Sequence, residues 1–170
     1  QARTGYEREN RAGIPLDAPH RNYRDANHKP EILCALTEFW GLNGFRTIED
    51  LRRQLQGYCP DTLAIFFASL HHLPFENALR QLFRHMLSLQ GREKDNLIAE
   101  AIEHAQKAAS DDPLSRWLLK LHTAYPGDIG ILAPIYLNLV QLAPGQAMYL
   151  PAGRLHAYLD GVGVELMANS

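Results

Sequence analysis

The stretch Ile135–Leu150, IYLNLVQLAPGQAMYL, decides the fold class, because apolar residues alternate with other residues along its first part. A period of two, as in IYLNLV, is typical of a β-strand. The next residues predict a turn at Ala143–Gln146, APGQ, and a short strand at Ala147–Leu150, AMYL. A further strand is predicted at Val162–Ala168, VGVELMA. The C-terminal part of the chain therefore has the pattern of antiparallel β-structure.

The middle of the chain, residues 47–127, has a helical periodicity instead. Thr47 is a predicted helix N-cap, with Asp50 three positions later, and apolar residues then recur on one helical face. Pro60 and Pro74 are each expected in the first turn of another helix, where the missing amide hydrogen costs nothing. These signals predict a cluster of short helices.

The N-terminal residues before Pro30 are polar and rich in turn-forming residues, with a short helix near their start. Glu31–Phe39 is expected to be a strand buried on both faces, closed by Gly41 and Gly44. A chain that leaves a strand, forms helices and returns to strands belongs to the α+β class. We expect a β portion in residues 1–46 and 128–170 and a helical domain in residues 47–127.

Composition excludes several classes of partner. The formal net charge of −2 provides no broad positive field for a phosphate backbone, so we expect no nucleic-acid partner. No apolar run approaches the roughly 20 residues that cross a bilayer, so we expect no membrane association. The two cysteines are too few for a disulfide framework and favour the cytoplasm. The sequence leaves the oligomeric state open.

Two short motifs contain candidate metal ligands. NHKPE places His28 shortly before the predicted strand and Glu31 at its first residue, and PAGRLHAY places His156 after a Pro-x-Gly turn. Zinc binds imidazole and carboxylate groups together, and distant segments commonly supply them. Each motif also has a simpler interpretation, a solvated turn for NHKPE and a surface histidine for His156.

Three longer segments resemble one enzyme family. YRDANHKPE, GDIGILAPIYLNLVQLAPGQAMYLPAG and LHAYLDGVGVELMANS are similar to segments of the type I phosphomannose isomerases, also called mannose-6-phosphate isomerases. PAGRLHAY is also similar to the second metal-binding motif of cupins. The resemblance implies part of a cupin-type β-barrel with an inserted helical domain, and a sugar phosphate as the small-molecule partner.

The resemblance also implies a zinc site. In the family, zinc is held by the Gln and His of a Gln-x-His-Pro motif, by a Glu that matches Glu31 and by a His that matches His156. The Gln-x-His-Pro motif and a catalytic Arg that follows the MANS segment have no match in this sequence. The chain is therefore expected to be a central fragment that is inactive alone.

The implied reaction interconverts mannose 6-phosphate and fructose 6-phosphate through a zinc-assisted cis-enediol. By resemblance, Lys29 transfers the proton, His28 assists ring opening, and Tyr158 and Glu165 bind sugar hydroxyls. Simpler roles remain for three of them: Lys29 holding the phosphate, Tyr158 packing, and Glu165 pairing with a nearby base. Other functions left open are another metal-dependent cupin enzyme, such as a dioxygenase or epimerase, and a non-catalytic fragment that binds a sugar or a protein partner.

Overall fold

The computed structural model, which describes residues 2–108 and 111–168, divides the chain close to the positions where the sequence period changes. Residues 1–44 and 140–170 form one unit, named here the β unit, and residues 45–139 form the helical unit. The predicted α+β class is confirmed. The predicted domain limits, 1–46 with 128–170 and 47–127, lie near these boundaries and stay a prediction.

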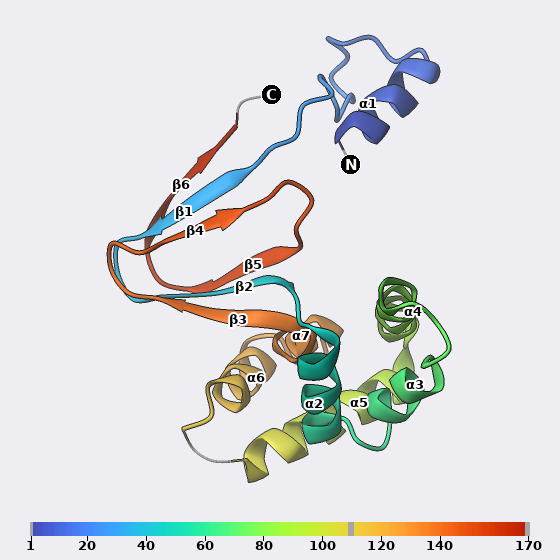
Figure 1. The fold of residues 1–170 in the computed structure, drawn as a ribbon, viewed down its shortest axis with the longest axis vertical. Coiled ribbons are helices and arrows are strands. Elements are labelled where there is room, and N and C mark those ends of the chain that lie inside the picture. Colours follow the sequence, from blue (N-terminus) through green and yellow to red (C-terminus); the bar gives the residue numbers. More distant parts are fainter. Residues whose placement is uncertain (1, 109–110, 169–170) are drawn as a thin grey trace. The chain divides into compact units, whose positions relative to one another are not determined.

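Within the described residues, the β-structure consists of two three-stranded sheets, ordered β4-β1-β6 and β3-β2-β5. The strands are β1 (Glu31–Ala35), β2 (Phe39–Phe45), β3 (Leu137–Leu142), β4 (Ala147–Leu150), β5 (His156–Asp160) and β6 (Gly163–Met167). Strands β6, β1 and β4 lie side by side although β1 is far from both in sequence (Figure 1). Helix α1 (Ala2–Arg11) and a long irregular segment precede β1.

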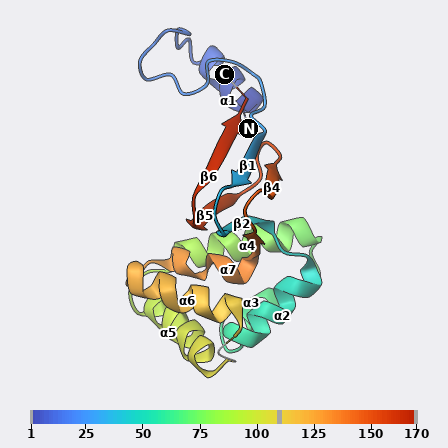
Figure 2. The ribbon, with the colours of Figure 1, turned by 90° about the vertical axis from the view of Figure 1, so that its left-hand side faces the viewer.

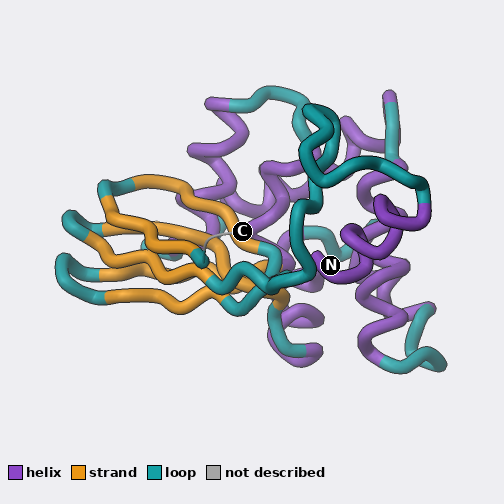
Figure 3. Tube along the Cα trace, turned by 90° about the horizontal axis from the view of Figure 1, so that it is seen from above, coloured by secondary structure: helices purple, strands orange, loops and turns teal. Residues whose placement is uncertain are grey.

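The β4–β5 connection lies at one end of the sheets, and the connections β1–β2, β3–β4 and β5–β6 lie at the other (Figure 1 and Figure 3). There the Leu36 amide donates to Val162 O at 2.8 Å, and the Gly145 amide donates to Ala35 O at 2.7 Å. The apolar core next to them is formed by Leu33, Ala35, Phe39, Leu142, Met148 and Leu150. The opposite end, where β1 and β5 begin, is free to carry polar side chains.

The structure corrects the strand expected at Glu31–Phe39. It is interrupted after Ala35, because the backbone of Leu36 bonds to the connection between β5 and β6. Only one face of β1 is buried, and Ile32 on the other face is 39% exposed. Gly41 and Gly44 lie inside β2 and do not close a strand.

The helical unit contains every helix after α1, gathered as Figure 2 shows. The helices are α2 (Ile48–Tyr58), α3 (Leu63–Ser69), α4 (Phe75–Ser88), α5 (Gly91–Lys107), α6 (Pro113–Ala124), the 3₁₀ helix η1 (Ile129–Leu132) and α7 (Ala133–Tyr136). Its fully buried side chains include Leu51, Leu55, Leu97, Leu118, Leu132 and Ile135. None of the described helices is both long enough and apolar enough to cross a membrane.

The first residue of α2 agrees with the prediction, whereas those of α3 and β3 differ from it. Thr47 caps α2 as expected, with its side chain accepting from the Asp50 amide. Pro60 precedes α3 by several residues and is not in its first turn. Ile135 and Tyr136, predicted to be in a strand, belong to the short helix α7, and the strand begins at Leu137. The cause is local, since α7 directly continues η1 and has a proline in its first turn.

The N-cap of α6 provides a test of the helical unit. The Asp112 carboxylate accepts from the Ser115 amide at 2.7 Å and also from the Tyr58 hydroxyl. Burial alone would raise the pKa of Asp112, but these hydrogen bonds outweigh it and lower the pKa below its ordinary value of 3.8. The stabilisation is therefore present above that value and is lost as the pH falls through the lowered pKa.

We predict that Asp112→Ala lowers the free energy of unfolding of the helical unit at neutral pH by about 1 to 2 kcal/mol, as loss of an N-cap does. Urea unfolding followed by circular dichroism measures the change. Asp111→Ala, at the preceding exposed position, is the matched control and should have little effect. Equal stability of the Asp112 variant and the control would contradict the assignment of the cap.

Candidate functional site

Three polar side chains of the β unit meet at the end of the sheets where β1 and β5 begin. Glu31 begins β1, His156 begins β5, and Glu165 lies in β6. Each offers one possible ligand atom, and the three atoms all lie within 4.8 Å of one another. His156 Nε2 is 3.3 Å from Glu31 Oε2, within the 3 to 4 Å expected for two ligands of one ion.

The strand register explains this convergence. Leu33 lies directly opposite Glu165 across the β1–β6 pair, and Glu31 is two residues before Leu33. Residues two apart on a strand share a face, so both carboxylates point to the same side of the sheet as the buried Leu33. The polar cluster thus continues the core face of the sheet at its end.

A turn orients His156. Gly153 has φ of +80° in the turn closed by the Arg154 amide and Pro151 O, a conformation that favours glycine. His156 Nδ1 lies 2.9 Å from Arg154 O, and a carbonyl oxygen only accepts, so Nδ1 carries the hydrogen of the neutral ring. In the neutral ring Nε2 has a lone pair toward Glu31, and in the protonated ring it donates to the Glu31 carboxylate. Two facing lone pairs suit a cation between them, and a backbone partner of this kind is usual for a metal-binding histidine.

Tyr158 belongs to the same cluster through Glu165. Its hydroxyl donates to Glu165 Oε1, and its ring packs edge-on against Phe39 with centroids 5.4 Å apart. Partial burial, the hydrogen bond to Glu165 and the negative charges of Glu165 and Glu31 all raise the pKa of Tyr158. The phenol is therefore protonated at neutral pH and acts as a hydrogen-bond donor.

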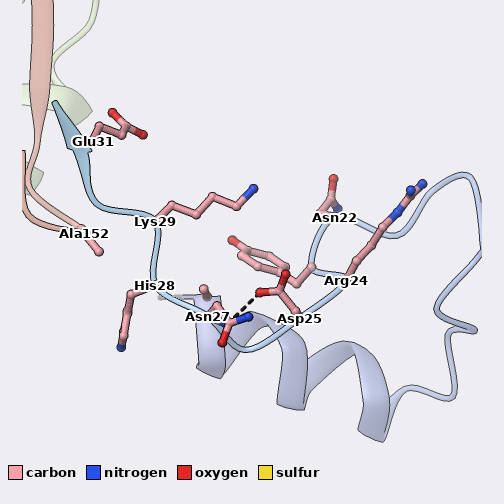
Figure 4. A pocket seen from close by; sticks show the side chains of 11 residues that line it. Asn22, Arg24, Asp25, Asn27, His28, Lys29, Glu31 and Ala152 are labelled. Carbon is pink, nitrogen blue, oxygen red and sulfur yellow. Dashed lines mark hydrogen bonds between the residues drawn. The ribbon is translucent and has the colours of Figure 1, made fainter. Parts of the chain in front are cut away.

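A pocket of about 260 Å³ lies beside Glu31. Its lining consists of Ala2, Asn22, Tyr23, Arg24, Asp25, Asn27, His28, Lys29, Glu31, Ala152 and Gly153. Lys29 and Glu31 project to the same side of the chain, whereas His28 projects in another direction (Figure 4). The Asp25 side chain accepts from the Asn27 amide at 2.7 Å and shapes the loop (Figure 4). The pocket therefore combines cationic, anionic and amide groups suited to a small polar ligand.

The structure brings together Glu31, His156, Tyr158 and Glu165 in the cluster, and Lys29, His28 and Glu31 in the pocket lining. Their roles in binding and catalysis stay predictions. Sequence reasoning did not single out Asn22 or Arg24 as pocket residues. The available signal was the dense polar composition of the segment between Asn22 and Glu31.

Comparisons with known proteins identify one family. The family model described as phosphomannose isomerase type I, catalytic domain, matches residues 7–48, and the helical insertion domain of the same family matches residues 61–137. The mannose-6-phosphate isomerase of Salmonella typhimurium is 42% identical over 166 residues, which are 98% of this chain and 41% of that protein. The human mannose-6-phosphate isomerase is 38% identical, with 92% of this chain and 40% of that protein covered.

Solved structures match this chain at a comparable sequence identity and coverage. The Salmonella typhimurium mannose 6-phosphate isomerase bound to its substrate fructose 6-phosphate and to zinc matches with a TM-score of 0.79 and 38% identity. The match covers 98% of this chain and 41% of that chain. The chain thus spans about two fifths of the length of the relatives it matches. The predicted fold, part of a cupin-type barrel with a helical insertion, is confirmed by these neighbours.

The hydrogen bond between Tyr158 and Glu165 predicts an unusual titration. We expect Tyr158 to ionise at a pH well above the ordinary tyrosine pKa of 10.0. The part of the titration curve that is missing in Tyr158→Phe identifies this residue. Glu165→Gln removes one negative charge and should lower the pKa of Tyr158 toward that value. Ultraviolet difference titration at alkaline pH measures both changes, with the exposed Tyr149→Phe as the comparison. Ionisation of Tyr158 at an unshifted pH would contradict the proposed hydrogen bond.

Proposed function

Because the chain belongs to the type I phosphomannose isomerase family, we propose that it contributes the zinc-binding cluster and the substrate pocket of an enzyme that interconverts mannose 6-phosphate and fructose 6-phosphate. The observation that carries the proposal is the approach of Glu31 and His156 beside a pocket lined by Lys29. The similarity to an isomerase bound to zinc and fructose 6-phosphate supports the same reaction. We also assign the enzyme to the cytoplasm, with a sugar phosphate as its partner.

Glu31 and His156 are the proposed zinc ligands. The fit rests on the donor set, an imidazole nitrogen and a carboxylate oxygen 3.3 Å apart, with the histidine tautomer set by Arg154 O. When bound, zinc supplies Lewis-acid stabilisation of negative charge on a carbonyl oxygen. A carboxylate oxygen of Glu165 also lies within 4.8 Å of these two ligand atoms. Glu165 is not assigned as a ligand, because it accepts a hydrogen bond from the Tyr158 hydroxyl.

The isomerisation moves a proton between C1 and C2 of the open-chain sugar through a cis-enediol. Lys29 is the proposed proton carrier, because its amine projects into the pocket on the same side as Glu31. His28 lines the pocket and projects in another direction than Lys29, and its proposed role in ring opening comes from the family resemblance alone. The Tyr158 hydroxyl uses its one hydrogen on Glu165, so the Tyr158 oxygen and the second carboxylate oxygen of Glu165 present acceptors that suit sugar hydroxyls.

The zinc assignment predicts different effects for the two glutamates. In the protein encoded by the complete reading frame that contains these residues, Glu31→Ala and His156→Ala should weaken zinc binding by more than about 100-fold, because changes to outer-shell partners alone cost roughly 10- to 100-fold. Glu165→Gln should retain zinc. Equilibrium dialysis with metal analysis measures the affinity, and Glu7→Ala and His20→Ala are the matched surface controls. Loss of zinc in Glu165→Gln would make Glu165 a ligand, and retention in Glu31→Ala would overturn the assignment.

The proton-transfer assignment predicts that Lys29→Met retains zinc and lowers kcat by roughly 10² to 10⁴, the usual contribution of a positioned acid–base group. A coupled assay of mannose 6-phosphate conversion measures the rate. Lys107→Met, which removes an exposed lysine paired with Glu103, is the control. An unchanged kcat with a raised KM would instead give Lys29 the role of holding the phosphate. An inactive unsubstituted protein with full zinc occupancy would overturn the proposed function.

A further inference from the structure

A buried pair of charged residues, Glu9 and Arg21, lies outside the proposed chemistry. Their side chains are 6% and 1% exposed, and Arg21 Nε is 3.8 Å from Glu9 Oε2. The guanidinium also donates to Tyr23 O at 2.7 Å, to Asn10 Oδ1 at 2.6 Å and to Ile14 O. A buried guanidinium with its donors used in this way holds the surrounding backbone in one arrangement.

The Glu9 carboxylate, on helix α1, accepts hydrogen bonds from the segment that follows Arg21. It accepts from the Tyr23 amide at 2.8 Å, from the Asn22 amide at 3.3 Å and from the Asn22 side chain at 3.4 Å. Burial alone would raise the pKa of Glu9, but these bonds and Arg21 outweigh it and lower the pKa, so the carboxylate is ionised at neutral pH. Both amides belong to residues that line the pocket beside Glu31.

Gly5 provides an independent contact on the same helix. A Cβ atom at Gly5 would lie 2.5 Å from the Tyr23 ring, closer than real Cβ contacts come. Glycine is a poor residue for the interior of a helix, so its presence here is explained by the close approach of that ring. Helix α1 therefore contacts Tyr23 in two ways, through its amide and through its ring.

We propose that Gly5, Glu9 and Arg21 are positioning residues that hold the Asn22–Tyr23 wall of the substrate pocket. The inference rests on the proposed function for its substrate, a sugar phosphate. Lys29 reaches into the space that this wall bounds, whereas the proposed zinc ligands are held by strand pairing and by the turn before His156. Displacement of the wall therefore weakens substrate binding and leaves zinc in place.

The kinetic test compares Gly5→Ala and Glu9→Gln with Glu7→Gln in the protein from the complete reading frame. Glu7 lies on the same helix, is 53% exposed and pairs with Arg3, so its substitution controls for a change on α1. We expect Gly5→Ala and Glu9→Gln to raise the KM for mannose 6-phosphate about tenfold, with kcat changed far less and zinc content unchanged. An unchanged KM, or loss of zinc together with activity, overturns the proposal.

A second background separates positioning from a general loss of stability. In a Tyr23→Ala protein the ring that meets Gly5 is absent, so adding Gly5→Ala should raise the KM no further. An equal further rise in that background overturns the proposed contact. Should Glu9→Gln fail to fold, the paired Gly5 and Tyr23 variants decide the question.

Hydrogen exchange tests the same wall without substrate. The amides of Asn22 and Tyr23 should exchange faster in Glu9→Gln than in Glu7→Gln, because Glu9 is their acceptor. If the unsubstituted protein shows no isomerase activity, the proposed function fails, and this measurement alone decides the positioning role. Equal exchange in the two variants overturns that role.

Discussion

The register of β1 between β4 and β6 is the constraint on which the candidate site depends. Glu31 lies opposite Leu150 on one side and Met167 on the other, so β1 is held at both edges by strands from the end of the chain. A shift of one residue would exchange the faces of every side chain on β1. Glu31 would then leave the core face and Ile32 would replace it, and the cluster with His156 would not form.

That register also brings together two carboxylates, Glu31 and Glu165, at the edge of an apolar core. Like charges at this separation disfavour each other, and partial burial strengthens the effect. The Tyr158 hydroxyl offsets part of it by donating to Glu165. A cation would offset more, since it attracts both carboxylates and Nε2 of the neutral His156 ring at once. The cluster therefore favours cation binding over the stability of the unliganded fold, as is common at functional sites.

Sequence reasoning worked where the signal was local. The Thr47 cap and the strand at Ala147–Leu150 were predicted because capping residues, turns and short alternation act over a few positions. Ile135 and Tyr136 were misassigned because two alternating residues also fit a single helical turn. The interruption of the first predicted strand at Leu36 depends on a hydrogen bond to Val162, which no local pattern indicates.

The candidate site was predictable in part. Glu31 and His156 were paired through family resemblance, and their proximity is confirmed, although neither motif alone required it. The place of Glu165 beside them follows from the β1–β6 register, which the sequence does not display. Glu9 and Arg21 lie in a polar, turn-rich segment that predicts a short helix and a loop, and their burial depends on the fold of the whole segment around them.

Pro30 connects the pocket with the cluster. The ring of a proline fixes its own φ and biases the preceding residue toward an extended conformation, so a helical conformation of Lys29 is disfavoured. Pro30 O accepts from the Ala168 amide at 3.2 Å, which continues the pairing of β1 with β6 beyond Glu31. Lys29 and Glu31 then project to the same side, two positions apart on an extended chain. The proline thereby sets the spacing between the proposed proton carrier and the proposed metal ligand before any ligand is bound.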